Sequence, residues 1–326
     1  MLEKYEKAGE IASKVRNEAA KKIKAGVKVG DIVDFVETSI KDTGAGLSFP
    51  CNVSINQIAA HYTADPGDET LFCRGDIVKL DLGAEVDGYI SDTAVTVIVE
   101  GENADNTDED GNLINMPGRL DNGDVEVSEE EIELRQQIKE ASSSALENAI
   151  SIIRDGTTLN EIGEIVQKTI QDMGFMPIVN LSGHSLERNN LHAGLSIPNY
   201  PDGSDHKLQE GDHIAVEPFA TNGIGEVNDL PNAYIYSYLR NRPLRQPDAR
   251  KLLKDISVNN TYFPFSKRAL IDKYPDLKSL NRAMRPLLVS RSIYPYSALK
   301  EKTDGMVAQT EHTLIVEKDS CEITTL

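Results

Sequence analysis

The sequence contains no tryptophan, few aromatic residues (6%) and only three cysteines. Three cysteines without a Cys-x-x-Cys pair form no disulfide framework, so we expect reduced core thiols rather than a metal or catalytic thiol. No run of about 18 apolar residues is present, which excludes a membrane-spanning helix. Residues 1–23 are charged and helix-patterned and lack the apolar segment of a secretory signal. These absences predict a cytoplasmic protein.

Negative charge predominates, and it is unevenly distributed. The net charge of −19 argues against general binding to nucleic acid. Residues 100–133 hold thirteen acids and one arginine, a net of −12, whereas residues 240–285 hold twelve Lys or Arg and four Asp, a net of +8. Residues 100–128 are polar and aperiodic and lack the alternating ligand spacing of a calcium loop, so they predict an acidic surface loop.

The chain contains an internal repeat. Residues 26–44 read GVKVGDIVDFVETSIKDTG, and residues 156–174, at an offset of 130, read GTTLNEIGEIVQKTIQDMG. Both copies place apolar residues at helical spacing and end at a glycine suited to a helix C-cap. Each copy follows another predicted amphipathic helix, at residues 2–25 and about 129–154.

A second block of the repeat consists of strand-like runs. Residues 75–81 read GDIVKLD and residues 211–217 read GDHIAVE, and each run ends in a carboxylate. An approximate two-fold relating the copies would bring Asp81 and Glu217 face to face. Two buried carboxylates at such a position resist ionisation unless a cation lies between them.

Three further residues extend this pair to a candidate metal site. Asp92 and Glu311 interrupt apolar, strand-like runs, and His184 follows a glycine in NLSGHSLERNNLHAG. Taken singly, each acid could belong to a turn or a bulge. A buried carboxylate needs a partner, however, and these runs supply no nearby Lys or Arg. Four carboxylates and one imidazole suit a pair of divalent ions such as Mn, Co, Fe, Zn or Ni.

The segments that carry these residues resemble one known family. KLDLGAEVDGYISDTA, NLSGHSLERNNLHAG, IAVEPFAT and AQTEHTLIVEKD are similar to the metal-binding segments of methionine aminopeptidases of the pita-bread fold. Residues 49–69 resemble the family segment that carries a catalytic histidine, here His61. The matches cover nearly the whole chain except residues 100–128.

The resemblance implies an α+β fold, a pseudo-two-fold pita-bread domain over residues 1–326 with a central antiparallel sheet flanked by helices. Glu217 and Glu311 are 94 residues apart, which resembles the type II enzymes, in the short archaeal-like form. We therefore expect a helical insert subdomain at residues 222–305.

The resemblance also implies site roles and a reaction. Asp81 would bind one metal, His184 and Glu217 the other, and Asp92 and Glu311 would bridge both. Glu217 would transfer the proton of the attacking water, and His61 and His192 would contact the substrate around the scissile bond. The implied reaction is removal of the initiator methionine from nascent polypeptides, with a small second residue preferred. Phe49, Leu191 and Tyr294 are candidates for an apolar methionine pocket.

Three alternative hypotheses concern other proteins of the same fold. An X-Pro peptidase or a creatine-hydrolysing enzyme of the same fold would normally carry a separate N-terminal domain. A non-catalytic member of the fold that binds partners or RNA would be expected to have lost several metal-binding residues. Elemental analysis that finds no metal in the purified protein would identify such a member. We expect a monomer without a membrane partner, with transient ribosome contact through the basic residues 240–285.

Overall fold

The computed structural model describes residues 2–103, 106–107, 112, 114–120 and 126–326, so part of the predicted acidic loop lies outside the described residues. The described helices are α1 (Leu2–Ala20), α2 (Val29–Asp42), α3 (Glu129–Ile152), α4 (Leu159–Asp172), α5 (Pro247–Asn259), α6 (Arg268–Ile271) and α7 (Leu277–Val289). No helix in this part of the chain is long and apolar enough to cross a membrane.

The described strands are short except for two. They are β1 (Gly46–Leu47), β2 (Asn52–Ile55), β3 (Ile58–Ala60), β4 (Ile77–Leu82), β5 (Ala84–Val86), β6 (Tyr89–Ile90), β7 (Thr93–Ile98), β8 (Met176–Pro177), β9 (Ser182–Ser185), β10 (Ser196–Pro198), β11 (His213–Val216), β12 (Phe219–Thr221), β13 (Val227–Tyr238), β14 (Phe265–Ser266), β15 (Ile293–Glu301), β16 (Val307–Gln309), β17 (His312–Val316) and β18 (Cys321–Ile323).

Helices α2 and α4 are the two copies of the predicted repeat. Both have 14 residues and begin 130 positions apart. Ile40 in α2 and its counterpart Ile170 in α4 are fully buried. Each helix is followed by a glycine with positive φ, Gly44 and Gly174, a backbone conformation that other residues rarely adopt. The helical repeat and its glycine ends are therefore confirmed.

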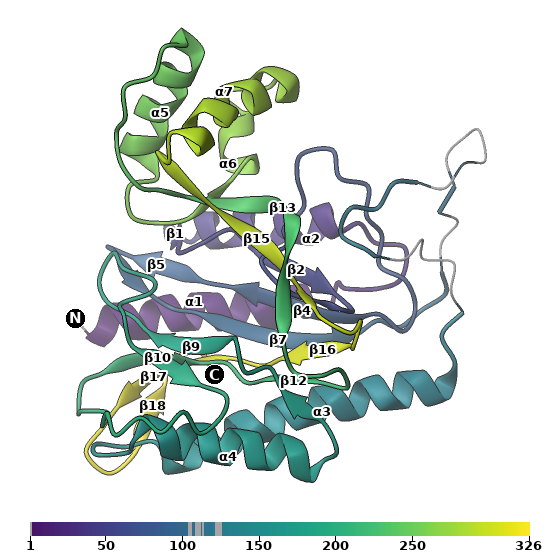
Figure 1. The fold of residues 1–326 in the computed structure, drawn as a ribbon, viewed down its shortest axis with the longest axis vertical. Helices are drawn as coiled ribbons and strands as arrows, with labels where there is room; N and C mark the ends of the chain where they lie inside the picture. Colours follow the sequence, from purple (N-terminus) through teal and green to yellow (C-terminus); the bar gives the residue numbers. More distant parts are fainter. Residues whose placement is uncertain (1, 104–105, 108–111, 113, 121–125) are drawn as a thin grey trace.

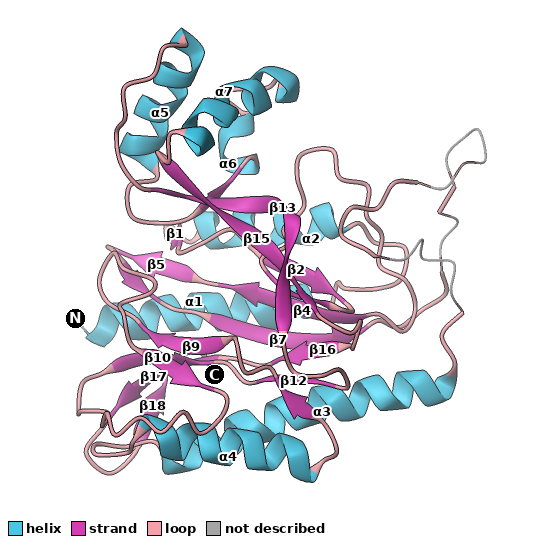
Figure 2. Ribbon diagram, in the orientation of Figure 1, coloured by secondary structure: helices cyan, strands magenta, loops and turns pink. Residues whose placement is uncertain are grey.

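The two copies form two halves that share one architecture. Helices α1 and α2 pack against the sheet β2-β4-β7, and α3 and α4 pack against β10-β9-β11-β17-β18 and β16-β12-β8 (Figures 1 and 2). Every strand pairing described is antiparallel, as predicted. The halves are joined where Ala94 pairs with Glu311 and where the Thr96 hydroxyl bonds the backbone of Gln309.

The sheet differs from the prediction in one respect. The sequence suggested that Asp92 and Glu311 lie within strands, but each occupies a break, between β6 and β7 and between β16 and β17 respectively. Glu217 directly follows β11, at the end of its run as predicted. In an unbroken strand, side chains alternate between the two faces. Carboxylates from several strands converge on one point more readily where the backbone leaves the regular ladder.

Residues 222–305 contain a long ribbon and three helices. Strands β13 and β15 pair along the ribbon, and α5, α6 and α7 pack on one of its faces around a separate core (Figure 1). Strand β15 also pairs with β3, where Leu299 lies opposite Ala60. Arg268 pairs with Asp34 on α2, and Lys267 Nζ lies 2.5 Å from a carboxylate oxygen of Asp65. These contacts fix the ribbon against the first half, beside the predicted site.

Two described residues of the acidic segment, Gly118 and Arg119, contact the first half of the protein. Arg119 is buried and pairs with the buried carboxylate of Asp76, which also accepts from Asn56 Nδ2 (3.0 Å). The backbone N–H of Gly118 donates to Thr70 Oγ1 (3.1 Å). Composition alone therefore hid an ion pair that ties this segment to the start of β4.

We expect Arg119→Ala to lower the free energy of unfolding by about 3–5 kcal/mol, because it leaves a buried carboxylate without its cation. Chemical denaturation measures the loss. The matched control is Arg74→Ala, which breaks the exposed Arg74–Glu129 pair and should cost at most about 1 kcal/mol. Similar losses in the two variants would contradict the structural importance of the buried pair.

Candidate active site

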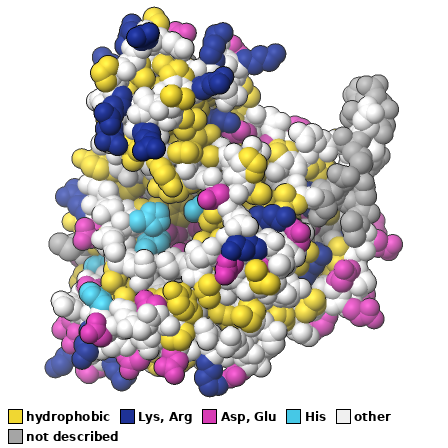
Figure 3. All heavy atoms as spheres, viewed as in Figure 1, with side chains coloured by type: hydrophobic (Ala, Val, Ile, Leu, Met, Phe, Trp, Pro, Cys, Tyr) yellow, Lys and Arg dark blue, Asp and Glu magenta, His cyan; other side chains and the backbone are white. Residues whose placement is uncertain are grey.

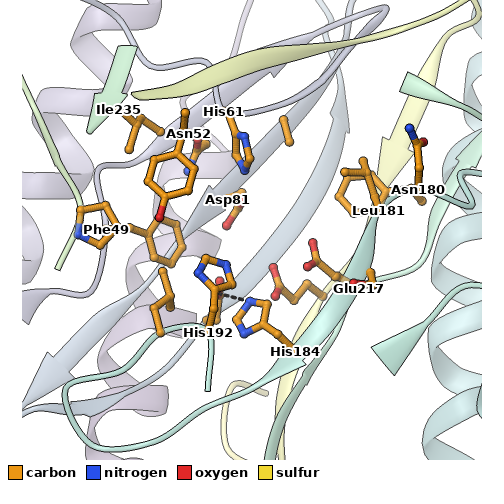
Figure 4. Close-up of a pocket in the computed structure, with 18 residues that line it drawn as sticks. Phe49, Asn52, His61, Asp81, Asn180, Leu181, His184, His192, Glu217 and Ile235 are labelled. Atoms are coloured by element: carbon orange, nitrogen blue, oxygen red, sulfur yellow. Dashed lines mark ion pairs between the residues drawn. The ribbon is translucent and has the colours of Figure 1, made fainter. Parts of the chain in front are cut away.

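All seven predicted site residues line one cavity of about 280 Å³ (Figure 4). Its polar lining includes His61, Asp81, Asp92, His184, His192, Glu217 and Glu311, and its apolar lining includes Phe49, Leu181, Leu191, Phe219, Ile235, Pro264 and Tyr296. Both halves and the β13–β15 ribbon contribute. Histidine side chains appear on the hollowed face below α5–α7 (Figure 3).

Asp92 and Glu311 form the centre of the site and come from different halves. Their backbones are held by short contacts: Glu311 N–H donates to the Ala94 carbonyl (3.0 Å), and Asp92 N–H donates to the Thr313 hydroxyl (2.8 Å). The Thr313 hydroxyl in turn donates to the Asp92 carbonyl (2.8 Å). The two acids are 4% and 1% exposed. The junction between the halves therefore sets their separation.

The remaining candidate ligands surround this pair. Asp81 lies near the end of β4, His184 within β9, and Glu217 directly after β11. His184 Nε2 is 3.5 Å from an Asp92 oxygen. Asp92, His184 and Glu311 each offer a ligand atom within 4.8 Å of the others. Asp81 and Glu217, which lie at the ends of the two corresponding runs of the repeat, thus both face the same cavity.

Burial makes the carboxylates resist ionisation. It raises the pKa of Asp92 to about 7. The pKa values of Asp81, Glu217 and Glu311 are raised well above the ordinary range, first by burial and then by neighbouring carboxylate charge. Burial lowers the pKa of His184 to about 4, so its imidazole is neutral and able to bind a metal. Such a cluster favours a bound cation.

The hydrogen bonding of these residues fits divalent ions. Oxygens of Asp81, Asp92 and Glu311, and Nδ1 of His184, are buried without a hydrogen-bond partner among the described residues. Buried polar atoms are normally paired. Carboxylate oxygens with one imidazole form a donor set suited to Mn, Fe, Co, Zn or Ni.

Gln309 is a site residue that the sequence analysis missed. Its Nε2 donates to Glu217 (3.0 Å), and its side chain lowers the pKa of both Glu217 and Asp81 against the larger effect of burial. Gln309 thus links the acids from the two copies of the repeat. The signal was a polar residue two positions before Glu311 in an otherwise strand-like run.

The ring of His61 has a defined tautomer. His61 follows β3 with a φ of 64°, and its Nδ1 lies 3.2 Å from the Ser297 carbonyl of β15. A carbonyl only accepts, so Nδ1 carries the proton and donates. Burial lowers the His61 pKa to about 4, and the neutral ring then presents an unprotonated Nε2.

The three candidates for the methionine pocket separate into two groups. Phe49 and Leu191 line the cavity, whereas Tyr294 does not and is 52% exposed. Tyr296, two residues further along β15, lines the cavity, with its ring 5.1 Å from that of Tyr294. The candidate Tyr294 was wrong because the strand carries it outward past the cavity edge. The His192 ring lies edge-to-face against the His184 ring, with their centroids 4.4 Å apart.

A buried cluster of carboxylates and an imidazole beside an apolar cavity is typical of metal-dependent hydrolases. The chain belongs to metallopeptidase family M24, whose model matches residues 3–317. It is 47% identical over 325 residues to a methionine aminopeptidase of Methanothermobacter thermautotrophicus, covering 100% of this chain and 99% of the relative. It is 46% identical to the Thermococcus kodakarensis enzyme of the same name, covering 98% and 97%.

Solved structures confirm the pita-bread fold. A thermophilic Arx1 has a TM-score of 0.80 at 19% identity, covering 99% of this chain and 90% of that one. The Rickettsia prowazekii methionine aminopeptidase has a TM-score of 0.66 at 19% identity, with coverage of 99% and 95%. An X-Pro aminopeptidase from Thermotoga maritima has a TM-score of 0.57 at 17% identity, and only 60% of that chain is covered. At these identities the likeness concerns the fold.

We expect divalent metal binding to the metal-stripped protein to release protons near neutral pH. Asp92, with a pKa of about 7, is partly protonated there and must ionise to bind. Affinity for Mn²⁺ should therefore rise as the pH increases from 6 to 8. Titration calorimetry in buffers of different ionisation enthalpy measures the protons released. An affinity independent of pH, with no protons released, would contradict this assignment.

Proposed function

We propose that this protein removes the N-terminal methionine from newly made polypeptides by metal-dependent hydrolysis. The carrying observation is the convergence of four carboxylates and His184 on one apolar-walled cavity. Full-length relatives at 41–47% identity bear the name methionine aminopeptidase, and the preference for a small second residue follows from the same resemblance. The cytoplasm is the proposed place of this reaction.

The proposed metal site holds two divalent ions. Asp81 would bind one, His184 and Glu217 the other, with Asp92 and Glu311 shared between them. Two facts support this division: Asp92 and Glu311 lie centrally, held across the junction of the halves, and Gln309 spaces Asp81 from Glu217. Such ions supply Lewis acidity, which promotes deprotonation of water and polarises the peptide carbonyl.

The chain's own residues would supply proton transfer and orientation. Glu217, whose pKa is raised by burial, is suited to take a proton from the attacking water and deliver it to the leaving amine. His61 Nε2, unprotonated because Nδ1 faces the Ser297 carbonyl, would accept the N–H of the scissile peptide. His192, at the exposed rim, would contact the substrate beyond the bond. Phe49, Ile235 and the other apolar residues would enclose the methionine side chain.

We expect Asp92→Ala and Glu311→Ala each to retain less than about a tenth of wild-type kcat/KM, because each removes a shared ligand. The assay follows Met-Ala-Ser, with Ala-Pro-Ala and acetyl-Met-Ala-Ser as controls, with and without Mn²⁺ or Co²⁺. Circular dichroism checks the fold, and elemental analysis measures metal content. Cleavage of Ala-Pro-Ala in preference to Met-Ala-Ser would instead indicate an X-Pro peptidase.

A contact with ribosomal RNA is the second part of the proposal. The basic insert surface consists of exposed cations on and before α5, none of which forms an ion pair with a described residue: Arg240, Arg242, Arg245, Lys251 and Lys254. Lysines and arginines are prominent over α5–α7 (Figure 3). Residues 240–285 carry a net charge of +8 in a chain of net charge −19, so their exposed cations are suited to bind phosphate groups. The same part of the chain, residues 222–305, supplies Ile235, Pro264 and Tyr296 to the cavity lining. Docking there would present the site to emerging chains.

We expect charge reversal of all five residues of the basic insert surface to glutamate to weaken ribosome binding, and wild-type binding to decline steeply with salt. Co-sedimentation across a salt series measures both effects. The control reverses three exposed lysines elsewhere: Lys14, Lys21 and Lys318. Equal binding by wild type and the five-residue variant, or binding insensitive to salt, would refute the contact and leave the peptidase assignment intact.

A further inference from the structure

Asn52 occupies a position in the cavity that the metal site does not explain. It begins β2 and lies directly opposite Asp81 of β4 in the antiparallel register. Side chains of directly opposed residues lie on the same face of the sheet, with Cβ atoms about 4.5–5.5 Å apart. Asn52 lines the cavity together with Phe49 and His61 (Figure 4). It thus lies where the carboxylate cluster meets the apolar pocket.

The orientation of the Asn52 amide is fixed. Its Nδ2 donates to the Pro50 carbonyl (3.1 Å), which identifies the other atom as the oxygen. The residue is 4% exposed, and its Oδ1 is buried without a hydrogen-bond partner in the described part of the chain. An oxygen of Asp81 is buried without a partner in the same way. The proposed metal site accounts for the Asp81 oxygen but not for Asn52 Oδ1, which therefore requires a hydrogen-bond donor.

The chemistry of a peptide substrate restricts the donor. A methionine side chain has no N–H or O–H, so it cannot satisfy Oδ1. The scissile amide has a single N–H, which His61 Nε2 is placed to accept. The free α-amine carries more than one N–H and can donate to two acceptors at once. It is also the group nearest the methionine side chain that the apolar wall would hold.

We infer that Asn52 is a specificity residue for the free N-terminus: its Oδ1 accepts a hydrogen bond from the substrate α-amine, beside Asp81. This inference rests on the proposed function. It assigns part of the selection against blocked N-termini to a neutral side chain of this sequence. An acetylated amine has lost all but one N–H and gains bulk at the position where Asn52 and Asp81 meet.

The test compares Asn52→Leu, which keeps the volume but removes the polar atoms, with Asn52→Ala. Both should lower kcat/KM for Met-Ala-Ser about 10- to 100-fold, since a hydrogen bond to a polar or charged group is lost. Norleucine-Ala-Ser should lose activity by the same factor. The matched control is Ser54→Ala, since Ser54 is buried on the same face of β2 with an unpaired hydroxyl but does not line the cavity. It should retain wild-type kinetics.

A binding measurement separates recognition from catalysis. Free L-methionine should raise the melting temperature of the Mn²⁺-loaded wild-type protein more than its des-amino analogue, 4-(methylthio)butanoic acid. In the Asn52 variants this difference in melting temperature should become smaller, with the Mn²⁺ content unchanged.

Three results would overturn the inference. The first is a fall in kcat/KM for the methionine peptide but not for the norleucine peptide, which would show that Asn52 contacts the thioether sulfur rather than the α-amine. The second is loss of Mn²⁺ from both variants, which would assign it to the metal site. The third is retention of more than half of wild-type kcat/KM. Failure of the wild-type protein to cleave Met-Ala-Ser would instead refute the proposed function.

Discussion

Repulsion among carboxylates buried around one centre is the constraint on which the rest of this structure depends. Asp81, Asp92, Glu217 and Glu311 have pKa values raised by burial, so the fold must hold them together against a preference to separate or to bind protons. Two sets of contacts supply that restraint. Backbone hydrogen bonds join the Ala94 and Glu311 segments, and the Gln309 amide lies between Asp81 and Glu217. Cations convert the repulsion into attraction.

The sequence predicted two kinds of feature: helices with a repeated apolar spacing, and acidic residues that interrupt apolar runs. Helices α2 and α4 were predictable because their apolar spacing is repeated at a fixed offset. Asp92 and Glu311 could be recognised because a buried acid within an apolar run needs a partner. Both signals are local and are visible without knowledge of the fold.

Features that depend on distant contacts could not be predicted in this way. Gln309 and Asn52 are ordinary polar residues until the fold places them beside Asp81. The choice of Tyr296 over Tyr294 depends on where β15 leaves the cavity edge. The burial of Arg119 depends on Asp76, which lies 43 positions away. The division of the chain into a catalytic domain, an acidic loop and an insert stays a prediction.

The β13–β15 ribbon is part of the cavity rather than an appendage to it. It supplies Ile235 and Tyr296 to the lining, and its Ser297 carbonyl determines which nitrogen of His61 carries the proton. Contacts of Lys267 and Arg268 with the first half hold it in place. A displacement of this unit would therefore change the pocket shape and the hydrogen-bonding character of His61 together.

The antiparallel bridge between Ala94 and Glu311 joins parts of the chain that are 217 positions apart. Bringing such distant segments together has an entropic cost, and it is met only when both halves have formed. Each half by itself carries an incomplete set of the cavity acids, Asp81 and Asp92 in the first and Glu217 and Glu311 in the second. Metal binding by the full set of donors consequently requires the complete tertiary structure, so the occupied site would report that the whole chain has folded.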